Sequence, residues 1–186
     1  MLLLIKKYYP LSPSFMGIIS NCVLRGMAMS NPEHQCVSIT FWQDLAQFEY
    51  AYQNRPTFKC DLLHLSRTVI ENYFEIFINI LQSIDPNDVS IEDPGDKLPH
   101  MRATTALQSI YKVEPEIVFE KCSQTIINLI KEQQSWVHCH TALLLIYSIL
   151  EHPINNVIFL PFLGNVFDYV IDFCTPKYCA HLRETA

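Results

Sequence analysis

The sequence predicts an all-α protein built from stacked helical hairpins, and three observations lead to this fold class. Apolar residues recur every three to four positions through most of the chain, which is the spacing of an amphipathic helix. Only 4 of the 186 residues are glycine, so few positions favour β-turns. Prolines and polar residues gather at a few points that divide the chain into helix-length segments.

The clearest hairpin is expected in residues 114–152. Pro115 suits the first turn of a helix, and the segment after it carries one apolar stripe. Beyond the polar turn at residues 132–135, the segment Trp136–Glu151 is apolar on nearly all sides until Pro153 ends it. Neighbouring helices must cover such a segment, so this hairpin predicts further copies of itself. The stripe of its first helix consists of Val118, Cys122, Ile126, Leu129 and Ile130.

Three other parts of the chain repeat the pattern. We expect hairpins in residues 14–52 and 58–113 and a truncated hairpin in residues 154–186, all within one solenoid segment. The spacing of Ser30–Glu33 is that of a capping box, which predicts the start of a second helix there. Met1–Pro13 is expected to be irregular because two prolines interrupt it.

The spacing of the hairpins indicates the kind of repeat. When the second helices are aligned by their first turns, small residues fall in one column at intervals of 67, 37 and 44 residues. The two shorter intervals fit the period of about 40 residues of HEAT repeats, and the longest interval contains an acidic insertion. The sequence therefore predicts a HEAT-repeat α-α superhelix with an incomplete last hairpin, in which small residues let paired helices approach closely. The column consists of Ser38, Thr105, Ala142 and Ala186.

Composition and charge exclude several function classes. The formal net charge of −6 argues against nucleic-acid binding and favours a basic protein partner. The seven cysteines are an odd number without a secretory signal, so we expect reduced, buried, intracellular thiols. Membrane insertion is not expected either, because Asn and Asp residues interrupt the apolar segment Ile154–Phe173.

No pattern of catalytic residues stands out. The chain has no glycine-rich phosphate loop, no nucleophile elbow and no paired carboxylates on a helix face, so we expect no enzyme activity and no cofactor. The trio His138–His140 contains zinc-type ligands, but on a helix these side chains point in different directions. Cys174, Cys179 and His181 lack a fourth ligand nearby, so no metal site is expected.

The acidic segment at residues 85–98 is the clearest change in composition. It is either a solvated connector between two helices or a surface that receives a basic partner. Two tryptophans also allow two interpretations, since tryptophan is common in binding hot spots and in cores. Trp42 follows Phe41 in an apolar helix and is expected in the core, whereas Trp136 and Arg102 are candidate contacts on a concave surface. The acids of the segment are Asp85, Asp88, Glu92, Asp93 and Asp96.

The order of four features resembles the middle of an importin-β type nuclear transport receptor of the karyopherin-β family. Ile39–Trp42 is similar to that family's apolar-x-Phe-Trp at the start of a second helix, and the acidic segment lies where the family has its acidic loop. Glu116–Pro153, with Trp136 at its turn, resembles the repeat after that loop. Leu182–Ala186 is similar to the family's hydrophobic-Arg-Asp-Thr-Ala helix opening.

This resemblance implies a function and partners. Asp85, Asp88, Glu92, Asp93 and Asp96 are expected to contact a Ran-type GTPase and the basic segment of an importin-α-like adaptor or basic cargo. Phe-Gly nucleoporins are expected to dock between first helices on the convex side. The implied location is the cytoplasm and nucleus, including the nuclear pore and envelope.

Two other function classes stay open. A HEAT-repeat scaffold subunit of a multiprotein complex would have the same architecture, but it would not respond to a Ran-type GTPase. An α-helical enzyme would need a metal or cofactor, and stoichiometric metal in an elemental analysis of the purified chain would favour this class. The leading hypothesis is a nuclear import receptor segment without chemistry of its own.

Overall fold

The computed structural model describes residues 2–55, 61–84, 98–132, 135–150, 156–179, 182–183 and 186. Every regular element in these residues is a helix, which confirms the predicted all-α fold class. The elements are α1 (Leu2–Lys7), the 3₁₀ helix η1 (Tyr9–Leu11), α2 (Pro13–Met27), α3 (Pro32–Gln53), α4 (Leu65–Gln82), α5 (Pro99–Val113), α6 (Pro115–Glu132), α7 (Trp136–Leu150) and α8 (Asn156–Phe173).

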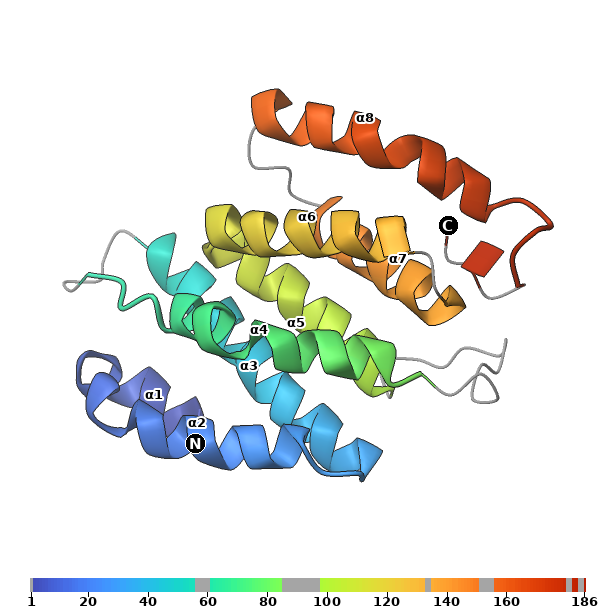
Figure 1. The fold of residues 1–186 in the computed structure, drawn as a ribbon. Helices are drawn as coiled ribbons and strands as arrows, with labels where there is room; N and C mark the ends of the chain where they lie inside the picture. The colour runs from blue at the N-terminus through green and yellow to red at the C-terminus, as the bar shows by residue number, and fades with distance from the viewer. Residues whose placement is uncertain are drawn as a thin grey trace.

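Figure 1 shows the helices in two layers that are stacked in chain order. α2, α4, α6 and α8 run in the same direction in one layer, while α3, α5 and α7 run in the opposite direction in the other. Within the first layer α4 packs on α6 and α6 on α8, and within the second α3 packs on α5 and α5 on α7. α3, α5 and α7 each also pack on the first-layer helix that precedes them in the chain. We call these the first-helix layer and the second-helix layer.

A single hydrophobic cluster draws side chains from both layers. Trp42 is 1% exposed, and its indole N–H points to the sulfur of Met27 at 3.2 Å. The predicted core role of Trp42 is therefore confirmed. The largest fully buried side chains besides Trp42 are Tyr111, Phe77, Phe173, Ile5, Met27, Ile39, Leu45, Ile70, Leu81, Leu107 and Ile110.

Prolines mark the starts of several helices, because a proline at the first position lacks only an N–H that has no helical partner there. α2, α3, α5 and α6 all begin with proline. α3 is capped by the Asn31 side chain, which accepts hydrogen bonds from the backbone N–H groups of Glu33 at 2.8 Å and His34 at 3.3 Å. The capping box was expected to start at Ser30, but the capping residue is Asn31, one position later. Asparagine caps a helix as well as serine does.

α2 and α3 approach closely at one point, as the column of small residues predicted. A Cβ atom added to Gly26 would lie 2.0 Å from the Oγ atom of Ser38. Glycine at position 26 and serine at position 38 therefore allow this crossing.

Two further expectations are wrong. The segment Met1–Pro13, expected to be irregular, is occupied mostly by α1 and η1, because Ile5 and Tyr9 are buried against the rest of the fold. Tertiary contacts thus order a segment too short to be a stable helix alone. The cysteines are not all buried either, since Cys22, Cys174 and Cys179 are exposed.

In the described part of the chain, none of the helices combines the length and apolar character that crossing a bilayer requires.

Candidate protein-binding surfaces

Two hollows lie on one side of α3 and share the residue Asp44. One has a volume of about 580 Å³ and is also lined by Arg102 of α5, and the other has a volume of about 340 Å³ and is also lined by Lys6 of α1. The residues that α3 contributes recur every three to four positions, so they form one face of the helix. We call this face the α3 groove. Its lining from α3 and the residues just after it is Glu33, Cys36, Val37, Thr40, Phe41, Asp44, Gln47, Phe48, Ala51, Tyr52 and Arg55.

The α3 groove combines apolar side chains with charged groups, of which Asp44 lies in its middle, where the two hollows join. Val37 is 71% exposed and lines the larger hollow together with the partly buried Phe41, and the partly buried Phe48 lines the smaller hollow. Burial raises the pKa of the Cys36 thiol, and the charge of Arg102 only partly opposes this effect, so the thiol stays neutral near pH 7. Protein–protein interfaces combine apolar and charged side chains in this way.

The predicted contact residues lie in different places. Arg102 lines the α3 groove, together with Val37 and Asp44, which no sequence pattern placed beside it. Trp136 is half-buried at the start of α7, with its ring 6.1 Å from that of His140. The His140 ring lies in turn 6.3 Å from that of His100 on α5. The predicted acidic site, Asp85, Asp88, Glu92, Asp93 and Asp96, lies outside the described residues.

A smaller hollow of about 250 Å³ lies between α6 and α8 in the first-helix layer. Its wall is mostly apolar, and Lys131, Asn165 and Tyr169 are the lining residues with polar groups. The hollow is large enough for an aromatic side chain but not for a folded partner. Its lining is Ile127, Ile130, Lys131, Asn165, Val166 and Tyr169.

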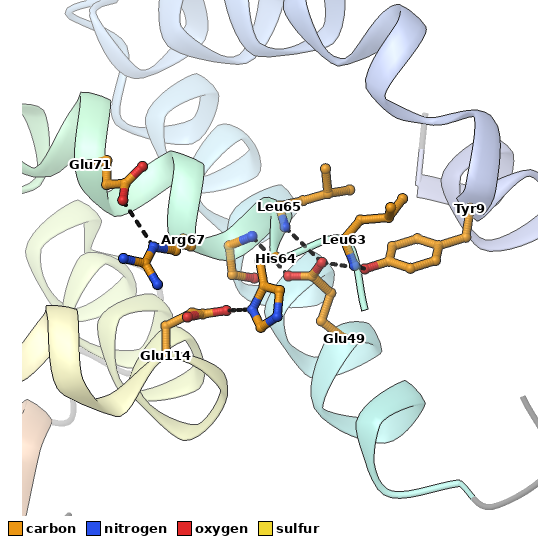
Figure 2. Close-up of polar contacts among 9 residues, drawn as sticks. Tyr9, Glu49, Leu63, His64, Leu65, Arg67, Glu71 and Glu114 are labelled. Atoms are coloured by element: carbon orange, nitrogen blue, oxygen red, sulfur yellow. Dashed lines mark hydrogen bonds and ion pairs between the residues drawn. The ribbon is translucent and has the colours of Figure 1, made fainter. Parts of the chain in front are cut away.

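A buried carboxylate joins the N-terminal segment to the rest of the fold (Figure 2). Glu49 is fully buried, and its carboxylate accepts hydrogen bonds from the Tyr9 hydroxyl at 2.5 Å and from the backbone N–H groups of Leu65 and Ser66, each at 2.8 Å. The Tyr9 hydroxyl itself accepts from the Leu63 N–H at 2.9 Å. Burial, followed by the contact with Glu49, raises the pKa of Tyr9 well above its usual range.

The side chain of Glu49, which lies on α3, caps the start of α4. The residue just before α4, His64, gives the helix no side-chain cap. The carboxyl oxygens of Glu49 instead accept hydrogen bonds from two of the first backbone N–H groups of that helix. Sequence reasoning missed this role. Glu49 follows the buried Leu45 by four residues and the buried Ala46 by three, so it lies on the buried face of α3. An acid alone on a buried helix face needs hydrogen-bond donors, and this pattern could have predicted the contacts of Glu49.

His64 holds a second polar contact. Its backbone is left-handed, with φ of 52°, and its ring Nδ1 contacts the carboxylate of Glu114 at the joint between α5 and α6. Nearby, Arg67 pairs with Glu71 across one helical turn at 2.9 Å. Glu114 is buried and His64 is half exposed, so this contact ties α4 to the next hairpin.

No cluster of three or more His, Cys, Asp or Glu side chains suited to a metal ion occurs among the described residues. His138 and Cys139 are described, but His181 of the second ligand-type group is not.

No protein-family model matches the chain, and no curated protein matches it either.

Proposed function

We propose that the chain is a HEAT-type solenoid segment of a nuclear import receptor, which binds protein partners on its two helical layers and carries out no chemistry. The observation that carries this proposal is the regular alternation of parallel first helices and antiparallel second helices, stacked in chain order. Stacks of this kind present extended surfaces to partners. The sequence resemblance narrows the class of partner to those of a nuclear transport receptor.

The two layers offer different sites. The second-helix layer carries the α3 groove, whose length and mixed chemistry suit an adaptor or cargo segment. The first-helix layer carries the hollow between α6 and α8, which suits the single phenylalanine of a Phe-Gly nucleoporin repeat. The Ran-type GTPase is assigned through the acidic residues Asp85–Asp96 by resemblance.

Binding of Phe-Gly peptides tests the proposal most directly. We expect a Phe-Gly repeat peptide to bind the chain and a matched Ser-Gly peptide not to bind, as measured by NMR shift changes in α6 and α8. Ile127→Ser should weaken binding about tenfold or more, because burying one aliphatic or aromatic side chain stabilises by about 1.5–3 kcal/mol. Val37→Ser, an exposed apolar residue on the other layer, is the matched control and should leave binding unchanged.

Binding of a Ran-type GTPase is the second test of the proposed function. A Ran-type GTPase should bind the chain in its GTP-bound form more tightly than in its GDP-bound form. If neither nucleotide form binds and the two peptides behave alike, the transport hypothesis is wrong, and the HEAT-repeat scaffold of a multiprotein complex becomes the better description.

A further inference from the structure

Three connections between helices share one set of polar contacts. These connections are η1 before α2, residues 61–64 before α4, and Glu114 between α5 and α6. Tyr9 lies at the first connection, His64 at the second and Glu114 at the third. Figure 2 shows the row of side chains that runs from Tyr9 through Glu49 to His64 and Glu114. We call these four side chains the connection network.

Two carboxylates link the three connections in sequence. The Glu49 carboxylate accepts hydrogen bonds from the Tyr9 hydroxyl and from the first two backbone N–H groups of α4, so it joins the first connection to the second. The Glu114 carboxylate contacts the ring of His64, so it joins the second connection to the third. The link is continuous, because His64 directly precedes the first residue of α4.

Helix packing contributes little to this link at the start of the first-helix layer. α4 packs on α6, but α2 and α4 have little contact with each other. The hydrogen bond between Tyr9 and Glu49 therefore ties the connection before α2 to the start of α4 at a place where the two helices scarcely touch.

Burial makes the network sensitive to the loss of any one member. Glu49 is fully buried, Tyr9 is almost fully buried, and the side chain of Glu114 is buried as well. A buried carboxylate depends on its hydrogen-bond donors, and a buried polar group that loses its partner is costly. Members of a buried polar network therefore depend on one another more than separate surface contacts do.

We propose that the connection network couples the three connections, so that a change at the connection before α2 alters the connection between α5 and α6. The change passes through Glu49 to the start of α4 and then through His64 to Glu114. The rotation between neighbouring repeats sets the curvature of a stacked-helix protein. The network thus holds three successive hairpins at fixed angles, in a transport receptor and in a scaffold alike.

Hydrogen exchange of the Tyr9→Phe variant tests the coupling. This change removes the hydroxyl but keeps the ring, which packs against Phe48 and Tyr52. The amide of Glu114, whose N–H donates to the Ile110 carbonyl at 2.9 Å, should exchange about tenfold faster in the variant, relative to amides of α7. Comparison with α7 removes the effect of a general loss of stability.

Tyr178→Phe is the matched control. The Tyr178 hydroxyl also donates to a carboxylate, that of Asp172 at 2.8 Å, but it lies outside the connection network. This variant should leave exchange at Glu114 unchanged. Faster exchange at the start of α4 in Tyr9→Phe, without a change at Glu114, would overturn the proposal, because the effect would then end at Glu49.

A double-mutant cycle between Tyr9 and His64 is the second measurement. The two side chains contact different carboxylates, and independent sites change the unfolding equilibrium constant additively in free energy, to within about twofold. We expect Tyr9→Phe combined with His64→Asn to deviate from the product of the single effects by about threefold or more in urea denaturation. Asparagine is chosen because it tolerates the left-handed backbone of His64, with φ of 52°.

The same cycle between Tyr178→Phe and His64→Asn is the control and should be additive. Additivity in both cycles would contradict the coupling. Equal deviations in both cycles would also contradict it, because they would reflect a general change of the fold rather than a path through Glu49.

Discussion

α7 and α8 are both rich in apolar residues, yet the fold treats them differently. α7 packs against α4, α5 and α6, and its side chains from Cys139 to Ile146 are all buried. α8 makes its main contact with α6 alone and leaves Phe167 and Ile171 largely exposed. The comparison shows that apolar composition sets how much surface a helix has to bury, whereas the number of neighbours sets how much it does bury.

Hydrogen exchange should show the largest difference between the two helices. We expect amides of α7 to exchange only through global unfolding, while amides of α8 open with a free energy lower by on the order of a few kcal/mol, because fewer contacts must break. Native-state exchange monitored by NMR or mass spectrometry measures both. Equal protection in α7 and α8 would contradict the assignment of α8 as a weakly supported end.

Truncating a leucine in each helix should give the next largest effect. Leu145 of α7 is fully buried, so Leu145→Ala is expected to lower the free energy of unfolding by about 2–5 kcal/mol. Leu160 of α8 is 58% exposed, so Leu160→Ala should change it by no more than about 0.5 kcal/mol. Urea denaturation of the two variants gives both values. Similar losses would show that α8 is covered in solution.

The loss of stability at alkaline pH should depend on Cys122, a buried thiol of α6, and not on Cys174, an exposed thiol beyond α8. Burial raises the pKa of Cys122 from 9.0 to about 12. Above pH 9 the unfolded chain loses this proton while the folded chain keeps it, so the unfolded state binds fewer protons and stability falls as pH rises toward 12.

The slope of this loss is about 1.4 kcal/mol per pH unit, fully developed about one unit above pH 9. Cys122→Ala should make the slope shallower but not abolish it, because burial also raises the pKa of the Cys36 and Cys139 thiols, and Cys174→Ala, at an exposed position, should leave the slope unchanged. Urea midpoints at about pH 8 and about pH 10 for the parent and both variants provide the test. A slope in the Cys122 variant as steep as that of the parent would show that Cys122 does not contribute to it.

Alanine substitutions at two helical glycines should give the smallest changes in stability, one an increase and the other a decrease. Nothing lies within 4 Å of a Cβ atom added to Gly164 in α8, so Gly164→Ala should stabilise the protein by about 0.5–1 kcal/mol through helix propensity. Gly26→Ala should destabilise it, because the new methyl group meets Ser38. Thermal melts of both variants suffice. Destabilisation by Gly164→Ala would mean that another surface approaches α8 closely.

Local patterns predicted most of the fold. The stripe Val118–Ile130, the apolar run after Trp136 and the prolines at helix starts depend on neighbours in sequence, and these determine where helices form. The acidic residues Asp85–Asp96 also stood out in the sequence, but they lie outside the described residues, so their proposed role stays a prediction.

Residues near one another in the sequence account for the helical fold class and the helix-length segments, because the apolar period of an amphipathic helix links residues only three or four positions apart. Which faces meet depends instead on tertiary contacts. Glu49 caps α4 from another helix, Asp44 lies where two hollows join, and Tyr147 of the apolar α7 is 56% exposed although its pattern predicted burial. These outcomes depend on contacts between residues far apart in the chain, which no local period encodes.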